Sequence, residues 1–472
     1  MPGTNKLAKN TFLFTLGGLL CKIVLFVFVP LFTFYLTTGE SGTLDILTNA
    51  SDLSMIFLSM GISEAVFRMA MEKNSDKKSV YSIGLLVSFI GNLVLLAFVP
   101  LINQITVISG YGLLLVAMSF TSQIKEVSRT FSRGLQKVGH HIIGDVVYTV
   151  VFSVLSVTFI IYMHLGIAGY LYAFILANVA EAIYLFISCG LFKYLTFKFE
   201  DNKLFSRMIL FAIPMIIPST SWWMINMTNK IMVTSYVDVS VSGIYSYAGK
   251  LPGYLAALFS YFSLAFMISA IGDYEEHGLT DFYSRVYKFI GVVFLVLTSV
   301  LITLNEPFTR FFVNAAYYDS WKYVPLITIA MILNCFAGFI NVVYQAVKKT
   351  AGATISAILG VILNLLLCFL LIKPLGVYGI VISSFVSVVF TYLYRYFDTR
   401  KFVRIHAGWR NYVIFALVIA QVALCFVLQG SVNYLLMANA VISSIAISFS
   451  VSYIYKEYKT LRTSNKTKLE KI

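Results

Sequence analysis

The chain has 472 residues, of which 59% are apolar and 12% are charged, and its mean hydropathy is +0.84. A soluble protein could not bury so much apolar surface, so the composition predicts a polytopic membrane protein. The net charge of +14 could suggest nucleic-acid binding, but the cations cluster in loops between apolar stretches, as membrane topology requires. The five cysteines form no CxxC pair, so we expect packing residues rather than disulfides or metal ligands.

The apolar stretches predict about fourteen spans, all helical, because runs this long form helices and not barrel strands. The first stretch is too long for a signal peptide and lacks a cleavage site, so we expect it to be a span as well. In chain order the expected spans are 11–36, 43–71, 79–102, 111–134, 140–163, 167–190, 206–235, 240–270, 284–304, 322–346, 351–372, 376–397, 411–429 and 433–455.

The loop charges predict the orientation of the chain in the membrane. With the N-terminus in the cytoplasm, 26 Lys and Arg residues lie on the inner side, in loops, tails and the cytoplasmic ends of spans, and only 3 lie on the outer side. The three outer cations are Arg310, Lys322 and Lys373. Because positive residues are retained on the cytoplasmic side, we expect both termini to be cytoplasmic.

The sequence also repeats weakly with a period of six spans. Gly42-Thr43-Leu44 is echoed by Gly243-Ile244-Tyr245, 201 residues later, and Gly166-Ile167-Ala168-Gly169 is echoed by Gly376-Val377-Tyr378-Gly379, 210 residues later. Such parallel repeats predict two lobes related by an axis along the membrane normal, with a substrate cleft between them. The expected organisation is an N-lobe (1–190), a cytoplasmic inter-lobe loop (191–205), a C-lobe (206–397), a basic cytoplasmic loop (398–410), two C-terminal spans (411–455) and a cytoplasmic tail (456–472).

The first two spans are unusually rich in ionisable residues, and a short polar turn at 37–42 is expected to join them. A charge at mid-bilayer costs at least about 2.5–3.5 kcal/mol, so such side chains usually face a cavity or a partner. The ionisable residues of this hairpin are Lys22, Asp45, Asp52, Glu64 and Arg68.

Several motifs of this hairpin and of the second lobe, taken in order, resemble one family. They are Lys9-Asn10-Thr11, Pro30-Leu31-Phe32-Thr33, Gly42-Thr43-Leu44-Asp45, Gly61-Ile62-Ser63-Glu64-Ala65-Val66-Phe67-Arg68, Ala212-Ile213-Pro214-Met215-Ile216-Ile217-Pro218, Trp222-Trp223 and Gly243-Ile244-Tyr245-Ser246-Tyr247. Together they are similar to the Wzx-type polysaccharide flippases of the multidrug/oligosaccharidyl-lipid/polysaccharide exporter superfamily. One departure is Asn229-Lys230, which stands where many relatives carry an acidic–basic pair.

The resemblance implies a flippase of the bacterial cytoplasmic membrane. Its substrate would be an undecaprenyl-diphosphate-linked oligosaccharide, moved to the outer leaflet by alternating access for O-antigen, capsule or exopolysaccharide synthesis. It would contact membrane lipids and the glycan polymerase machinery, but no nucleic acid. The alternatives are a flippase for lipid II or a teichoic-acid precursor, a multidrug/cation antiporter and a non-transporting scaffold for glycan polymerases.

An anionic diphosphate needs cations along its path, so the cations within the spans are candidate substrate-binding residues. They are Lys22, Arg68, Lys125, Arg129, Lys230 and Lys250. Four of them also have a structural explanation: Lys22 could neutralise Asp45 or Asp52, Arg68 could pair with Glu64, and Lys125 and Arg129 could extend their charged ends to the interface. Lys250 precedes Leu251-Pro252-Gly253, where we expect the helix to bend.

Four of the six carboxylates within the spans are candidates for coupling to sodium ions or protons. They are Asp45, Asp52, Asp145 and Glu181, and the last two could instead pair with cations of their own lobe. His140 and His141 are expected at a membrane–loop boundary without a metal. The chain has no Walker motif and no catalytic constellation, so we expect a transporter without a cofactor or metal, not an enzyme.

Overall fold

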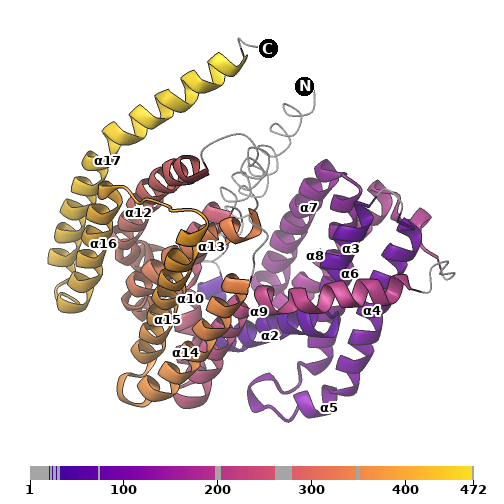
Figure 1. Cartoon of the computed structure of the whole chain (residues 1–472). Coiled ribbons are helices and arrows are strands. Elements are labelled where there is room, and N and C mark those ends of the chain that lie inside the picture. Colours follow the sequence, from indigo (N-terminus) through magenta and orange to yellow (C-terminus); the bar gives the residue numbers. More distant parts are fainter. Residues whose placement is uncertain are drawn as a thin grey trace. The chain divides into compact units, whose positions relative to one another are not determined.

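The computed structural model describes residues 32–72, 75–196, 203–260, 279–346 and 351–469, together with residues 21, 24 and 28. This part of the chain is built from helices and the turns between them, so the all-α polytopic class is confirmed (Figure 1). Two compact units form, an N-terminal unit (Met1–Ser246) and a C-terminal unit (Tyr247–Ile472).

The described helices of the N-terminal unit surround buried apolar clusters. They are α2 (Thr38–Leu58), α3 (Ile62–Ala70), α4 (Lys77–Ala97), α5 (Val99–Ile102), η1 (Thr106–Ile108), α6 (Gly112–Gly134), α7 (Val138–Ser156), the π-helical η2 (Val157–Tyr162), α8 (Gly166–Ser188), η3 (Leu191–Tyr194), α9 (Leu204–Tyr236) and the first residues of α10 (Val239–Ala248).

The C-terminal unit has one large aromatic core around Tyr287, Phe336 and Phe339. Its helices are α12 (Leu279–Phe312), η4 (Ala315–Lys322), α13 (Val324–Ala346), α14 (Ala351–Leu375), α15 (Val377–Asp398), η5 (Thr399–Lys401), α16 (Trp409–Val427) and α17 (Val432–Leu469). The last of these continues in helical form through most of the expected tail.

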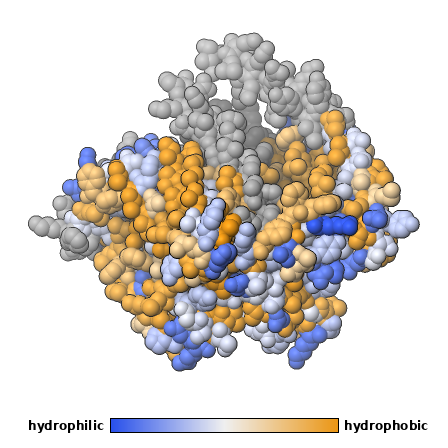
Figure 2. All heavy atoms as spheres, turned by 180° about the vertical axis from the view of Figure 1, so that it is seen from behind, coloured by the Kyte–Doolittle hydropathy of each residue, from blue (hydrophilic) through white to orange (hydrophobic). Residues whose placement is uncertain are grey.

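The described helices are long and apolar enough for a membrane. Nine of them could each cross it, or ten if α2 and α3 form one bent span. Their outward faces are apolar: Ile187 on α8 is 69% exposed, and Leu370 on α14 is 69% exposed. Figure 2 shows apolar residues covering much of one face of the molecule. The other expected spans include residues that the structure leaves undescribed, so the count of about fourteen stays a prediction.

The first hairpin differs from its prediction in two ways. The expected polar turn at 37–42 is the first turn of α2, because Thr37 and Glu40 form a capping box: Thr37 Oγ1 accepts from the Glu40 N–H at 3.2 Å, and Glu40 Oε2 accepts from the Thr37 N–H at 2.8 Å. The expected continuous helix 43–71 is broken after Leu58 and bends by 58° before Ile62. The break uses left-handed backbone at Met60 and Gly61.

The helix is interrupted near Lys250, slightly earlier in the chain than the expected bend, and the bend itself stays a prediction. Helix α10 ends at Ala248, Gly249 is a turn, and helical structure resumes at Lys250. The Gly253 N–H donates to the Gly249 carbonyl at 3.0 Å, so the chain is already helical where Pro252 occurs.

Within the N-terminal unit, the first turns of α2 and α10 cross in direct backbone contact. A Cβ atom added to Gly42 would lie 2.3 Å from the Val239 carbonyl oxygen, and one added to Gly243 would lie 2.0 Å from the Thr38 carbonyl oxygen. Each glycine would also meet the other's backbone nitrogen, at 3.2 and 3.1 Å. The contact is reciprocal, and only glycine permits it.

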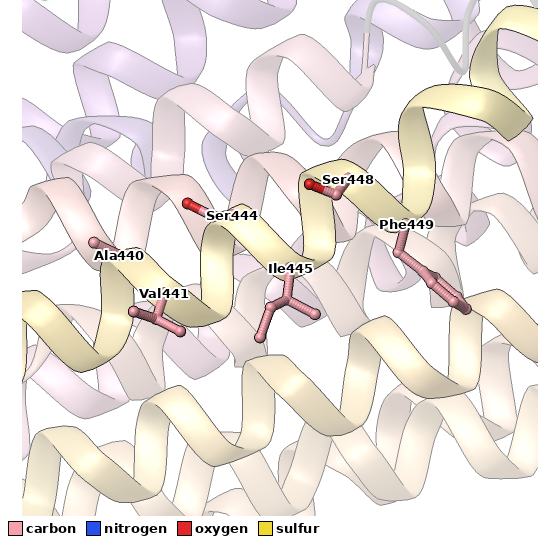
Figure 3. A pocket seen from close by; sticks show the side chains of 6 residues that line it. All are labelled: Ala440, Val441, Ser444, Ile445, Ser448 and Phe449. Carbon is pink, nitrogen blue, oxygen red and sulfur yellow. The ribbon is translucent and has the colours of Figure 1, made fainter.

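A shallow groove lies along the outward side of α17 in the C-terminal unit. Figure 3 shows Ser444 and Ser448 on one side of the helix and Val441 and Ile445 on the other. No charged side chain lines it, and it lies within a candidate membrane span. A groove of this composition fits a lipid-facing surface and offers no chemistry for a charged headgroup.

Candidate functional site

Helix α2 carries Asp45 and Asp52 on one face, because they are seven residues apart. Asp45 Oδ2 lies 3.0 Å from Lys230 Nζ on α9, and the two side chains are only 13% and 17% exposed. The hairpin carboxylate therefore pairs with a lysine 185 residues later in the chain. Lys22, the expected partner, lies outside the described residues.

Helix α6 presents Lys125 and Arg129 one turn apart toward α7 and α8. Lys125 Nζ lies 3.9 Å from Glu181 Oε2 and 4.6 Å from the centre of the Tyr148 ring. Glu181 is 1% exposed, so its carboxylate depends on this lysine for neutralisation. The aromatic ring gives the lysine a second favourable contact on the other side.

Arg129 is the centre of a second charged group. Its Nη2 lies 3.1 Å from Asp145 Oδ1 and its Nη1 lies 3.9 Å from Glu126 Oε2. Its Nε donates to His141 Nδ1 at 3.1 Å, and His141 is 1% exposed. The ring is buried inside the protein because the first turn of α7 points it toward α6, and its expected place at a membrane–loop boundary stays a prediction.

Asp52 lies between these groups. It is an exposed side chain of α2, yet it is close enough to interact electrostatically with both Lys125 and Lys230. Among the described residues it forms no ion pair or hydrogen bond, unlike Asp45, Asp145 and Glu181. The accessible carboxylate of this region is thus Asp52.

These side chains define the N-terminal charged cluster. Its members are Asp45, Asp52, Lys125, Glu126, Arg129, His141, Asp145, Glu181 and Lys230. Five carboxylates stand against three lysine and arginine side chains, and each of these cations already has an acidic partner. The three cations of this cluster are therefore not free, as a purely cationic cavity would require.

The other predicted site residues lie outside this cluster. Arg68 is exposed on α3 and, within the described chain, forms no ion pair with Glu64, which is also exposed. Lys250 is exposed at the start of the helical segment after Gly249, in the C-terminal unit. That Lys22, Asp52, Arg68 and Lys250 line one cleft between lobes stays a prediction.

Sequence reasoning missed two contributors to the cluster. The Tyr148 ring and the His141 imidazole became visible only with the packing of α6 against α7 and α8. A signal for Tyr148 was present in the sequence: it follows Asp145 by three residues and His141 by seven, so all three share one helix face.

The sequence matches a model of the family described as "Polysaccharide biosynthesis protein" over residues 7–267. The chain belongs to this family. Among curated proteins the chain has no match. The expected resemblance to polysaccharide flippases is thereby confirmed at the level of the family.

The fold of this polysaccharide biosynthesis protein is shared with solved transporters. The lipid II flippase MurJ in an inward closed conformation has a TM-score of 0.63 at 14% identity, covering 95% of this chain and 98% of that one. An inward-facing MATE family multidrug resistance transporter of the MOP superfamily has a TM-score of 0.62 at 16% identity, with coverage of 84% and 94%. A mutant of the Vibrio cholerae MATE transporter VcmN has a TM-score of 0.55 at 16% identity, with coverage of 85% and 99%.

Proposed function

We propose that this polysaccharide biosynthesis protein is a flippase for an undecaprenyl-diphosphate-linked oligosaccharide. It would carry the repeat unit from the cytoplasmic to the outer leaflet of the bacterial cytoplasmic membrane without changing a covalent bond. Family membership and the fold shared with MurJ support a lipid-linked substrate. The observation that carries the proposal furthest is the N-terminal charged cluster, in which Asp145 and Glu181 lie on the candidate membrane spans α7 and α8 and pair with cations of α6.

The geometry suggests how a diphosphate would be handled. Lys125 and Arg129 are one turn apart and reach Glu181 and Asp145 at 3.9 and 3.1 Å, so an arriving diphosphate has to compete with these carboxylates. Neutralising Glu181 and Asp145 with a proton or a sodium ion would release the two cations for the headgroup. Cation uptake and substrate binding would then favour each other, which is a coupling between sites.

Asp52 has the position to be the first carboxylate that a cation meets, since it is exposed and, in the described chain, unpaired. Asp45 would bind a cation next, once Lys230 leaves it to contact the substrate. Lys22, Arg68, Lys230 and Lys250 remain proposed contacts along the path. Both termini would be cytoplasmic, and the product would pass to the glycan polymerase machinery.

The test uses the full chain in proteoliposomes that hold a fluorescent lipid-linked oligosaccharide, with a membrane-impermeant quencher reporting translocation. Replacing Lys125 with Ala should lower the flipping rate at least about tenfold, because the substitution removes a headgroup contact and leaves Glu181 without its cation. Glu181→Gln imitates the neutralised carboxylate, so it should keep substrate affinity while losing the dependence on a sodium or proton gradient.

Arg207→Ala is the matched control. Arg207 belongs to the same unit, but it is 55% exposed and its partner Glu72 is 42% exposed, so its removal should leave flipping near the wild-type rate. If Lys125→Ala flips as fast as Arg207→Ala while both fold, the cluster does not handle the headgroup. Lipid II and a teichoic-acid precursor would be offered in parallel, and faster flipping of either would replace the proposed substrate.

One observation favours a second candidate, cation-coupled export of organic cations. In the N-terminal charged cluster acids outnumber lysine and arginine, and Asp52 is accessible, which suits a positively charged cargo. The same vesicles can decide between the two. Export of a fluorescent organic cation that Asp52→Asn abolishes, with no flipping of lipid-linked oligosaccharide, would favour the antiporter.

A further inference from the structure

The last turns of α12 contain polar side chains that are almost completely buried in the C-terminal unit. Asn305 and Glu306 are 2% exposed, and Thr309, one turn further on, is 0% exposed. Opposite them lies η4, where Ser320 is 0% exposed and Trp321 is 2% exposed. The expected span ends at 304, whereas α12 continues to Phe312 and Glu306 is buried within it.

Two hydrogen bonds tie these groups together. The Tyr318 hydroxyl donates to Glu306 Oε1 at 2.6 Å, and Asn305 Nδ2 donates to the Trp321 carbonyl at 2.8 Å. Because both bonds join α12 to η4, the remaining oxygen atoms of Glu306 and Asn305 are held at the interface of these two elements. Burial raises the pKa of Tyr318, and the Glu306 carboxylate raises it further, to about 12.

Several oxygen atoms at this interface lack a partner. Within the described chain no hydrogen bond reaches four of them: Glu306 Oε2, Asn305 Oδ1, Thr309 Oγ1 and Ser320 Oγ. Buried polar atoms are nearly always satisfied, and an orphaned one points to a bound water or ion. Four at one interface, one of them on a carboxylate, form a set that is costly to bury unless something binds it.

The charge of Glu306 indicates that the missing partner of these oxygen atoms is a cation. In the described part of the chain no lysine or arginine nitrogen lies within 4.0 Å of it; Arg310, one turn later, is exposed, and Lys322 is paired with Asp319 at 2.6 Å. A buried carboxylate without a counter-charge is strongly destabilising. A hydrogen-bond donor alone would satisfy the oxygen atoms but would leave this charge in place.

We propose that Glu306, Asn305, Thr309 and Ser320 form a sodium-binding site. Hard cations prefer carboxylate, amide and hydroxyl oxygen ligands, which is the set found here. One carboxylate among neutral ligands balances a single positive charge, so the geometry points to a monovalent ion and not to calcium. The site belongs to the C-terminal unit, shares no residue with the N-terminal charged cluster, and its occupancy can be measured without transport.

The test is sodium-dependent stability of the full-length protein in detergent. All five cysteines are buried, so a thiol-reactive dye reports unfolding directly. Replacing choline chloride with sodium chloride at equal ionic strength should raise the Tm by about 3 °C, with a smaller rise in potassium chloride. Glu306→Gln should abolish the sodium-specific part of this rise.

Asp319→Asn is the matched control, because Asp319 lies on the same η4 helix but is 60% exposed and already paired with Lys322. This variant should keep the full sodium shift. Should Glu306→Gln fail to fold, Thr309→Val replaces one ligand at nearly constant volume and should raise the half-saturating sodium concentration about tenfold.

Radioactive sodium binding to the purified protein gives a second readout, and one ion per chain should be lost in Glu306→Gln. Equal stability in sodium, potassium and choline would overturn the proposal and assign the orphaned atoms to buried water. If sodium still raises the Tm of Glu306→Gln but not that of Asp52→Asn, the ion binds in the N-terminal unit, and the proposal is overturned.

Discussion

The Asp45–Lys230 ion pair is the sharpest test of how the N-terminal unit is held together. Its atoms are 3.0 Å apart and its side chains are 13% and 17% exposed, so it joins α2 to α9 away from bulk water. Removing one partner of a buried pair costs about 3–5 kcal/mol, because the other charge is left unpaired. With this partial exposure we expect the lower end, about 3 kcal/mol, for Lys230→Met or Asp45→Asn alone.

The double variant separates this cost from simple loss of packing. With both charges removed no unpaired ion remains, so Lys230→Met with Asp45→Asn should fall within about 1 kcal/mol of wild type. For a unit of this size, 1 kcal/mol shifts the Tm by about 2–4 °C, so each single variant should lose about 6–12 °C and the double variant much less.

Thermal unfolding in detergent, followed by thiol exposure, measures all three variants. The surface pair Arg207–Glu72, at 3.5 Å with 55% and 42% exposure, is the comparison, and Glu72→Gln should cost about 0–1 kcal/mol. Single variants as stable as Glu72→Gln, or a double variant whose loss equals the sum of the two singles, would show that the pair is not a buried structural contact.

Three further predictions concern function, topology and pH. Lys22→Ala should abolish flipping while the protein still inserts, and Lys22→Arg should keep part of the rate in the proteoliposome assay, since a cation is needed at that depth; full activity of Lys22→Ala would remove it from the path. A cysteine at Ala315 should react with an impermeant maleimide added outside cells and one at Phe402 should not; the opposite pattern would invert the topology. The backbone N–H of Ser240 donates to Asp238 Oδ1 at 2.6 Å and holds the pKa of Asp238 below its usual range, so this carboxylate stabilises the fold above about pH 4 and loses that effect on acidification. Asp238→Ala should therefore lower the Tm at pH 7, with a gap to wild type that closes toward about pH 3; a gap that stays constant with pH would contradict the charge-based explanation.

Helix periodicity in the sequence was enough to predict which side chains share a face of one helix. The seven-residue spacing of Asp45 and Asp52 and the four-residue spacing of Lys125 and Arg129 predicted shared helix faces, and the structure shows each pair directed at common neighbours. Glu181 was also expected to have a partner in its own lobe, and Lys125 is that partner.

The sequence did not predict contacts between helices that are far apart in the chain, or the position at which the backbone becomes left-handed. No periodicity links Asp45 to Lys230, because the pair depends on how α9 crosses α2. The break before Ile62 was missed because apolarity continues through it, although Gly61 marked a position able to adopt left-handed backbone. The capping box was readable in advance, since Thr37 and Glu40 have the spacing that begins a helix rather than a turn.

The crossing of α2 and α10 has a consequence for the history of the chain. Gly42 lies against Val239 and Gly243, and Gly243 lies against Thr38 and Gly42. Thr38 and Val239, like Gly42 and Gly243, are 201 residues apart, which is the offset found in the sequence repeat. Self-complementary contacts of this form arise when two identical protomers meet across a twofold axis. A duplicated ancestor would have made this contact with a second copy of itself, so one mutation would have altered both sides at once. After a fusion the two sides could vary independently, but each glycine still lies against main chain, so no substitution at one makes room for a side chain at the other.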